Sequence, residues 1–201
     1  ASVPPLVKIT SPAVADVVAE ALLTGGNPSS VHGSGRAARM VVEKAREQVA
    51  NLVGAAAGDV IFTSGGTEAN NLCLRTFHKA GRKLLVSAVE HPSIMTTALE
   101  LDATIIPVDH NGQVQAGALE TLLKAEANGD GQPVLVSIMT ANNETGVVQP
   151  IRELAEVAHQ SGALLHTDAV QAGGKIPFDM KVLGADLVTI SAHKIAGPAG
   201  S

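Results

Sequence analysis

Val134-Leu-Val-Ser-Ile-Met139 is a continuous apolar run of strand length, and it decides the class of fold. Strands of a parallel sheet that is covered on both faces read as unbroken apolar runs rather than as alternating ones. Pro150 opens and Gly162 ends a predicted helix over Ile151 to Ser161. A second strand is predicted directly after it, over Ala163 to Thr167. This order predicts a strand–helix–strand unit of a mainly parallel α/β sheet.

The same alternation continues along the rest of the chain. Further strands are predicted over residues 59–62, 83–89, 103–108 and 186–190. Further helices are predicted over residues 11–23, 35–53 and 116–125, after Thr67, and after His91-Pro92. No internal repeat and no interdomain linker interrupts this pattern, so we expect one α/β domain over residues 1–201.

The composition of the chain argues against several classes of function, among them nucleic-acid binding. The chain has 201 residues, of which 45% are hydrophobic, enough for the core of one large domain. The net charge is -5 and no Lys/Arg block occurs, so nucleic acid is not an expected partner. The apolar runs are far shorter than the about 20 residues of a membrane span, so no membrane association is expected. The single cysteine, Cys73, indicates a reducing compartment, and we expect a cytoplasmic protein.

Polar motifs follow five of the predicted strands. They are Ser64-Gly-Gly-Thr-Glu-Ala-Asn70, Glu90-His91, Asn142-Asn-Glu-Thr145, Asp168-Ala-Val-Gln171 and Ser191-Ala-His-Lys194. In open α/β sheets, ligands bind beyond the carboxyl ends of the strands. The five motifs together therefore predict a binding site at this edge of the sheet.

Lys194 and Asp168 indicate the kind of ligand. Burial at a strand end can depress the pKa of a lysine and free its amine as a nucleophile. A buried carboxylate such as Asp168 needs a partner, and a protonated pyridine nitrogen would be one. A lysine that forms a Schiff base and an aspartate that holds the ring nitrogen are what a pyridoxal phosphate site requires. The alternative for Lys194 is an ordinary solvated lysine in a loop.

Other residues could complete such a site. Gly66 and Thr67 at a helix start could bind a phosphate, or could form a plain glycine turn with Thr67 as N-cap. Ser191 and His193 could share that phosphate, and Gln171 could bond the phenolic oxygen of the ring.

His91 and Asn143 each leave two interpretations open. His91 could stack on a cofactor ring and shuttle protons, or could cap the helix that follows it. Asn143 could donate its amide to the ring oxygen or to a substrate carboxylate, or could belong to a plain turn. We interpret His166 as structural and Cys73 as a core residue that is poorly placed to be a nucleophile.

In combination, these motifs resemble those of the class V aminotransferase family, and most of all its cysteine desulfurase branch. The resemblance covers about residues 27–198 and includes Asn27-Pro-Ser-Ser30 with His32-Gly33, and Gly174-Lys-Ile-Pro177. It implies a fold-type-I pyridoxal phosphate enzyme with a three-layer αβα large domain. The implied reaction removes sulfur from L-cysteine and leaves alanine. The sulfur, held as a persulfide, would pass to an acceptor or scaffold protein, as in iron–sulfur cluster assembly.

The resemblance also implies roles for single residues, and these agree with the roles inferred above. Lys194 would hold pyridoxal phosphate and later shuttle a proton, His91 would stack on its ring, and Asp168 would pair with the ring nitrogen. Gln171 would contact the ring oxygen, with Asn143 near that oxygen and the substrate carboxylate. The phosphate would be bound by Gly66, Thr67, Ser191 and His193. A homodimer is implied as well, and no metal centre is expected.

Three departures from the family pattern keep other functions open. The sequence stops at Ser201, before the expected last strand, the loop with the catalytic cysteine and the small domain with a carboxylate-binding arginine. Ala1 to Thr10 lacks the usual acidic entry strand, and Ala196 and Ala199 replace an aromatic and a basic residue. The alternatives are a selenocysteine lyase or aminotransferase of the same family, or a binding or assembly module without turnover. A nucleotide-binding domain is disfavoured, because the sequence has neither a dinucleotide fingerprint nor a P-loop.

Overall fold

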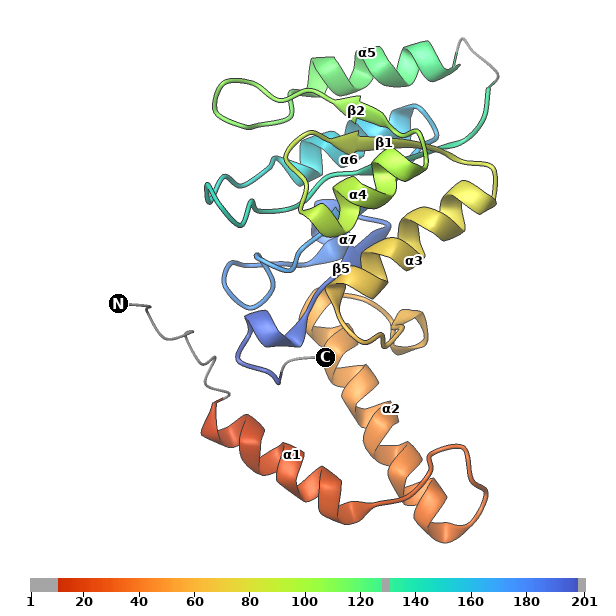
Figure 1. The fold of residues 1–201 in the computed structure, drawn as a ribbon, viewed down its shortest axis with the longest axis vertical. Helices are drawn as coiled ribbons and strands as arrows, with labels where there is room; N and C mark the ends of the chain where they lie inside the picture. The colour runs from red at the N-terminus through yellow and green to blue at the C-terminus, as the bar shows by residue number, and fades with distance from the viewer. Residues whose placement is uncertain (1–10, 128–130, 199–201) are drawn as a thin grey trace. The chain divides into compact units, whose positions relative to one another are not determined.

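The computed structural model describes residues 11–127 and 131–198 (Figure 1). Two departures noted above, at Ala1 to Thr10 and at Ala199, lie outside these residues. The chain divides into two compact units. One comprises the described part of residues 1–62 together with that of 191–201, and the other comprises residues 63–190.

The second unit is built on a five-stranded parallel sheet. Its strands are β1 (Lys83–Ser87), β2 (Thr104–Ile106), β3 (Val134–Ser137), β4 (Leu164–Asp168) and β5 (Leu187–Thr189). They lie in the order β2-β1-β3-β4-β5. The carboxyl ends of parallel strands share one edge of the sheet, so the loops after β1, β3, β4 and β5 all leave from the same edge.

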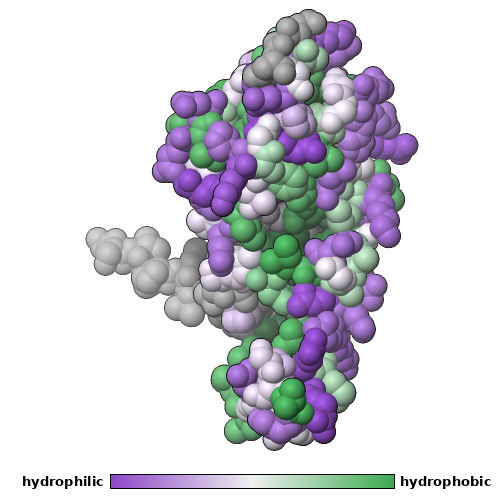
Figure 2. All heavy atoms as spheres, turned by 90° about the vertical axis from the view of Figure 1, so that its right-hand side faces the viewer, coloured by the Kyte–Doolittle hydropathy of each residue, from purple (hydrophilic) through white to green (hydrophobic). Residues whose placement is uncertain are grey.

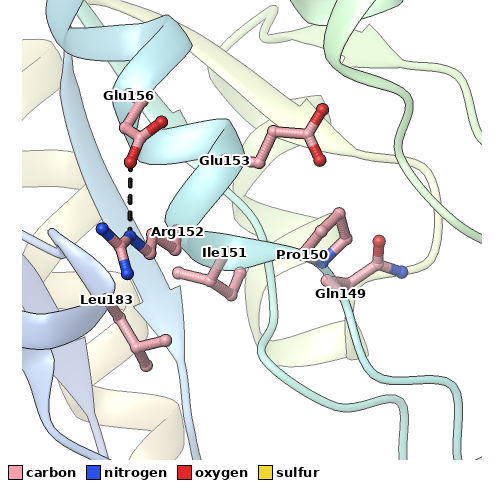
Figure 3. A pocket seen from close by; sticks show the side chains of 7 residues that line it. All are labelled: Gln149, Pro150, Ile151, Arg152, Glu153, Glu156 and Leu183. Carbon is pink, nitrogen blue, oxygen red and sulfur yellow. Dashed lines mark hydrogen bonds and ion pairs between the residues drawn. The ribbon is translucent and has the colours of Figure 1, made fainter.

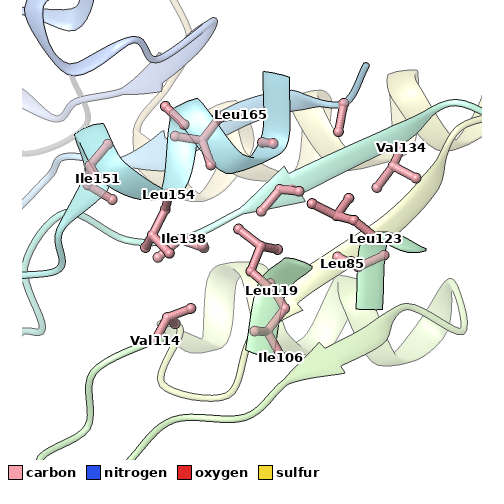
Figure 4. Close-up of a cluster of buried hydrophobic side chains, with 14 of the residues drawn as sticks. Leu85, Ile106, Val114, Leu119, Leu123, Val134, Ile138, Ile151, Leu154 and Leu165 are labelled. Atoms are coloured by element: carbon pink, nitrogen blue, oxygen red, sulfur yellow. The ribbon is translucent and has the colours of Figure 1, made fainter. Parts of the chain in front are cut away.

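Helices cover both faces of this sheet. They are α3 (Gly66–Lys79), α4 (Pro92–Glu100), α5 (Ala116–Ala127), α6 (Ile151–Gln160) and the short α7 (Met180–Leu183). Alternate strand residues point to opposite faces, and the two cores divide accordingly. Leu84 and Leu135 pack with Leu74 of α3 and Ile94 of α4. The larger core lies on the other face, where β1, β3 and β4 meet α5 and α6 (Figure 4).

Ten labelled members of the larger core appear in Figure 4, and all are nearly or fully buried. Leu85 and Leu165 of the strands pack with Leu119 of α5 and Leu154 of α6. These buried apolar side chains provide the hydrophobic stabilisation of the unit. The predicted α/β class and the three-layer αβα arrangement are confirmed for residues 63–190.

The first unit is helical. It contains α1 (Pro12–Thr24), α2 (Gly33–Val53) and two short 3₁₀ helices, η1 (Ala57–Asp59) and η2 (Ala192–Lys194). Ser11 caps α1 by accepting a hydrogen bond from the Val14 N–H, and Gly25 ends it, as predicted. The start of α2 is two residues earlier than predicted, because His32 accepts from the Gly35 N–H and caps the helix.

One predicted strand is wrong. Residues 60–62 form no strand, and Asp59 ends η1. The apolar Ile61 and Phe62 indicated a buried strand, but both side chains are exposed. Arg46 of α2 binds this segment instead: its guanidinium donates to the Val60 carbonyl and lies 5.0 Å from the centre of the Phe62 ring. A strand requires a neighbouring strand, and the described part of this unit contains none.

The surface is mixed in character. Figure 2 shows one face, on which hydrophilic and hydrophobic residues are interspersed. Exposed large apolar side chains are found on α1 and α2, among them Val17, Leu22 and Met40. Over the residues with a described structure, no helix is both long and apolar enough to cross a membrane.

Candidate active site

Asp168 is the last residue of β4 and is 5% exposed. Its Oδ1 accepts a hydrogen bond of 2.9 Å from the Val170 N–H, and its Oδ2 accepts one of 2.8 Å from the Asn70 side chain. Burial raises the pKa of Asp168, while the two N–H donors and the nearby His91 act in the opposite direction. A carboxylate has about four lone-pair sites, so these two donors leave capacity for a further cationic donor.

Asn70 is buried on the inner face of α3 and binds two partners. One N–H of its amide goes to Asp168 and the other to Ser93 Oγ, at 2.9 Å. Ser93 Oγ in turn lies 2.8 Å from His91 Nδ1. The structure thus links His91 and Asp168, two predicted site residues, through Asn70 and Ser93.

His91 caps α4. Its Nδ1 accepts from the Ser93 N–H at 3.1 Å, and Pro92 is the first helical residue. The capping interpretation of this histidine is confirmed. The ring is exposed, so the cap leaves room for a ligand against it, and its stacking role stays a prediction.

Glu90, immediately before His91, is a second buried carboxyl group at this edge of the sheet. Its Oε1 accepts a 2.6 Å hydrogen bond from the Met139 N–H, which lies just beyond β3. Burial raises the pKa of Glu90 well above its ordinary value, and the nearby Asp168 carboxylate raises it further. Burial thus favours the neutral form of Glu90 more strongly than that of Asp168, whose two N–H donors favour its charge.

The start of α3 offers unpaired donors. Gly66 is its first residue, and the N-cap Gly65 has φ of 152° and no side chain to satisfy the first N–H groups. Such an end favours an anion. Thr67 is exposed within the first turn, as a phosphate ligand would need to be. The alternative in which Thr67 is the N-cap is wrong, because Gly65 occupies that position.

Asn143 and Gln171 lie in the loops after β3 and β4. The turn at residues 142–145 is made by Asn142, whose Oδ1 accepts from the N–H groups of Glu144 and Thr145 at 2.9 and 2.8 Å. Asn143 is exposed beside it. Gln171 is half-buried and accepts from Lys175 Nζ at 2.7 Å. Their contacts with a cofactor stay predictions.

Ser191, His193 and Lys194 lie together in the first unit. Ser191 is 4% exposed, and its Oγ lies 2.6 Å from His193 Nδ1. Lys194 is half-buried at the end of η2, so it is not a fully solvated loop lysine. Gly197 is required nearby, because a Cβ there would lie 2.6 Å from the Ala192 Cβ. Lys194 and Asp168 belong to different units, so their action on one ring stays a prediction.

Two interpretations of single residues are confirmed. His166 is fully enclosed between Ser137 Oγ, 2.9 Å from Nδ1, and Thr189 Oγ, 3.1 Å from Nε2, and is structural. Cys73 packs against the core formed by α3 and α4, and burial raises its pKa to about 12. A thiol held in that protonated state is a poor nucleophile.

A pocket of about 420 Å³ lies elsewhere, at the start of α6 beside α7 (Figure 3). Arg152 and Glu156 form an ion pair at its edge, and Leu183 of α7 closes one side. None of the predicted site residues lines it, and it is open to solvent.

Asn70 and Glu90 lie in the polar motifs that predict the site, but the sequence interpretation assigned no role to them or to Ser93. A signal for Asn70 does exist in the sequence. Together with Cys73, Leu74 and Phe77 it follows the i, i+3, i+4, i+7 spacing of a buried helix face, where an amide stands out. The sequence holds no comparable signal for the burial of Glu90.

The chain matches the aminotransferase class-V family over residues 9–201. Among curated proteins, it is 41% identical over 184 residues to "Cysteine desulfurase IscS" of Dictyoglomus turgidum, with 87% of this chain and 45% of that protein aligned. It is 42% identical over 185 residues to "Putative cysteine desulfurase IscS 1" of Bacillus subtilis, with 88% and 47% aligned. The chain thus spans about half the length of the curated relatives it matches.

Solved structures of related proteins are also similar to this chain. The NifS-like protein from Rickettsia africae superposes with a TM-score of 0.88 at 37% identity, over 96% of this chain and 53% of that one. A structure titled "SspA in complex with cysteine" superposes with a TM-score of 0.81 at 29% identity, over 93% of this chain and 56% of that one. On its sequence and its fold, this chain belongs to the aminotransferase class-V family.

Proposed function

We propose that this chain is the cofactor-binding part of a pyridoxal phosphate-dependent cysteine desulfurase, which releases sulfur from L-cysteine and leaves alanine. Pyridoxal phosphate is the cofactor of the family to which the chain belongs. Its curated relatives are named as cysteine desulfurases, and one structural relative was solved with cysteine. The observation that carries the proposal is the buried, N–H-stabilised carboxylate of Asp168 at the carboxyl end of β4.

The donor set fits this cofactor. Pyridoxal phosphate presents a basic ring nitrogen, an aldehyde and a phosphate, and when bound it supplies an electron sink. Asp168 has spare acceptor capacity for a protonated ring nitrogen. The uncapped start of α3 has N–H groups for a dianion, and Lys194 has the amine for a carbonyl carbon.

Each site residue either binds a part of the cofactor or holds or moves a proton. Asp168 would keep the ring nitrogen protonated. The Lys194 amine would hold the cofactor through its aldehyde carbon and, once the substrate amine has displaced it, would carry a proton to and from the substrate carbon. His91 stacks on the ring. Gly66, Thr67, Ser191 and His193 bind the phosphate, while Gln171 and Asn143 bind the ring oxygen, with Asn143 also near the substrate carboxylate.

The leaving sulfur needs an accessible thiolate, and Cys73 does not qualify, because burial holds its pKa at about 12. We propose that another cysteine of the whole protein takes the sulfur as a persulfide and passes it to an acceptor or scaffold protein, as in iron–sulfur cluster assembly. The proposal includes a homodimer in the cytoplasm.

The test is product analysis on the whole protein with pyridoxal phosphate, L-cysteine and a thiol reductant. Sulfide and alanine should form in equal amounts. Asp168→Ala should lower kcat by about a hundredfold or more, because it removes the charge that stabilises the ring nitrogen. Asp179→Ala is the matched control, since Asp179 only caps α7. Transamination without sulfide, or full turnover in Asp168→Ala, would contradict the proposal.

A further inference from the structure

Asn70 is an amide on a helix face that otherwise packs apolar side chains. It is 1% exposed, and Leu74, one turn further along α3, is completely buried. A buried amide is unfavourable unless its polar atoms are paired. The nitrogen of Asn70 is paired twice, but its Oδ1 is buried and has no hydrogen-bond partner within the described structure.

An unpaired buried carbonyl is destabilising, so packing alone would favour a leucine here. The amide must therefore serve a purpose other than filling the core. Its two N–H groups point to Ser93 Oγ and Asp168 Oδ2, and both contacts are shorter than 3.0 Å.

The orientation of the Asn70 amide is fixed by Asp168. An ionised carboxylate only accepts hydrogen bonds, so the opposite orientation would place Asn70 Oδ1 against Asp168 Oδ2 and repel it. The second N–H then has to meet Ser93.

That contact determines where the Ser93 proton goes. Because Ser93 Oγ accepts from Asn70, its single O–H points to His91 Nδ1, 2.8 Å away. His91 Nδ1 also accepts from the Ser93 N–H at 3.1 Å. With two donors at Nδ1, the neutral imidazole carries its proton on Nε2.

We propose that Asn70 is a positioning residue of this site, which holds the Asp168 carboxylate and, through Ser93, the His91 ring in one hydrogen-bonded line. This inference rests on the proposed function, in which Asp168 and His91 act on the cofactor. Asn70 itself need not touch cofactor or substrate.

The direction of the effect follows from the groups around Asp168. Burial and the Glu90 carboxyl, which comes from the end of β1, disfavour its charge. The Val170 N–H, the Asn70 N–H and His91 at the start of α4 favour it. Removing the Asn70 donor therefore makes Asp168 bind its proton more tightly.

The first experiment is a ¹³C NMR pH titration of the aspartate carboxyl groups in the whole protein freed of pyridoxal phosphate. Asp168→Asn assigns the Asp168 signal by its loss. In Asn70→Leu the Asp168 midpoint should rise by about one pH unit, as loss of a hydrogen bond to a charged group implies. Should Asn70→Leu fail to fold, the isosteric Asn70→Asp replaces it and should raise the midpoint further.

Asn71→Leu is the matched control. Asn71 is the neighbour of Asn70 on α3 and also binds the start of α4, through the Ser93 carbonyl and Thr97 Oγ1, but it does not bind Asp168. It should leave the Asp168 midpoint within about 0.3 pH units of wild type. An unchanged midpoint in the Asn70 variants, or an equal rise in Asn71→Leu, would overturn the proposal.

The second experiment separates this inference from the proposed function. In the loaded whole protein, Asn70→Leu should lower kcat about tenfold with KM for L-cysteine within twofold of wild type, because Asn70 acts through Asp168 and not on substrate. A wild type without sulfide release would refute the proposed function, while the NMR midpoint would still decide the role of Asn70. An unchanged kcat in Asn70→Leu, with an active wild type, would refute that role.

Discussion

His166 joins three strands of the sheet through its two ring nitrogens, which contact Ser137 of β3 and Thr189 of β5. Burial lowers its pKa to about 4, from an ordinary value of 6.5. The unfolded chain therefore binds a proton more readily than the folded chain between these values. The neutral ring contributes stability that is complete above pH 6.5 and is lost as the pH falls toward 4.

The lost stability should amount to about 3 kcal/mol. Urea unfolding of wild type and His166→Gln at several pH values measures it. The glutamine does not titrate, so the stability of wild type relative to the variant should fall by that amount from about pH 7 to about pH 4. A difference that stays constant with pH would contradict the burial argument.

The contribution of Glu90 to the stability of the fold should depend on pH in the opposite direction to that of His166. Its folded pKa is raised well above 4.5, so its contribution to stability is present below pH 4.5 and is lost as the pH rises. Glu90→Gln imitates the neutral acid and can keep accepting the Met139 N–H. The variant should therefore gain stability relative to wild type between about pH 4.5 and about pH 7. If the relative stability of Glu90→Gln declines over that range in urea unfolding, Glu90 is not the neutral carboxyl group.

At the scale of single elements, the start of α2 depends on a glycine. A Cβ on Gly35 would lie 2.4 Å from the Ser30 carbonyl oxygen and 2.9 Å from that of Asn27. The turn at residues 27–30 thus packs directly on the helix backbone. Gly33, in the same first turn, has nothing within 4 Å of such an atom.

Gly35→Ala should consequently lower the free energy of unfolding by about 1–3 kcal/mol, since backbone atoms would have to move. Gly33→Ala is the matched control and should be neutral or stabilising by up to about 1 kcal/mol. Urea unfolding followed by circular dichroism compares the two. Equal effects of both substitutions would show that the turn can move away without loss.

The sequence predicted correctly those helices whose ends are marked by residues that start or stop a helix. Pro150 and Gly162 bracket α6, and Ser11 and Gly25 bracket α1, because these residues act on the backbone locally. The segment 59–62 shows the limit of such reasoning. Its apolar residues suited a strand, but strand formation depends on a distant neighbour that no local pattern specifies.

The site residues likewise divide into those indicated by local sequence and those that depend on distant partners. Asp168 and His91 could be proposed as site residues because each follows an apolar strand, and ligands bind beyond the carboxyl ends of parallel strands. The hydrogen bonds of Asn70 and Glu90 could not be predicted, since their partners lie 98 and 49 residues away in sequence. Cys73 was correctly placed in the core by its position inside a helix.

At the scale of the whole molecule, the proposed chemistry draws on both units. The second supplies Asp168, His91 and the start of α3, and the first supplies Ser191, His193 and Lys194. This chemistry requires that the amine of Lys194 reach the aldehyde of the cofactor whose ring nitrogen Asp168 would hold.

Borohydride trapping measures this most directly. The whole protein is incubated with pyridoxal phosphate, reduced, digested, and its peptides are analysed by mass spectrometry, with Lys194→Ala as control. The account predicts one phosphopyridoxyl group, on the peptide that contains Lys194, and none on the corresponding peptide of the variant. A label on another lysine, such as Lys175, with Lys194 unmodified would contradict it.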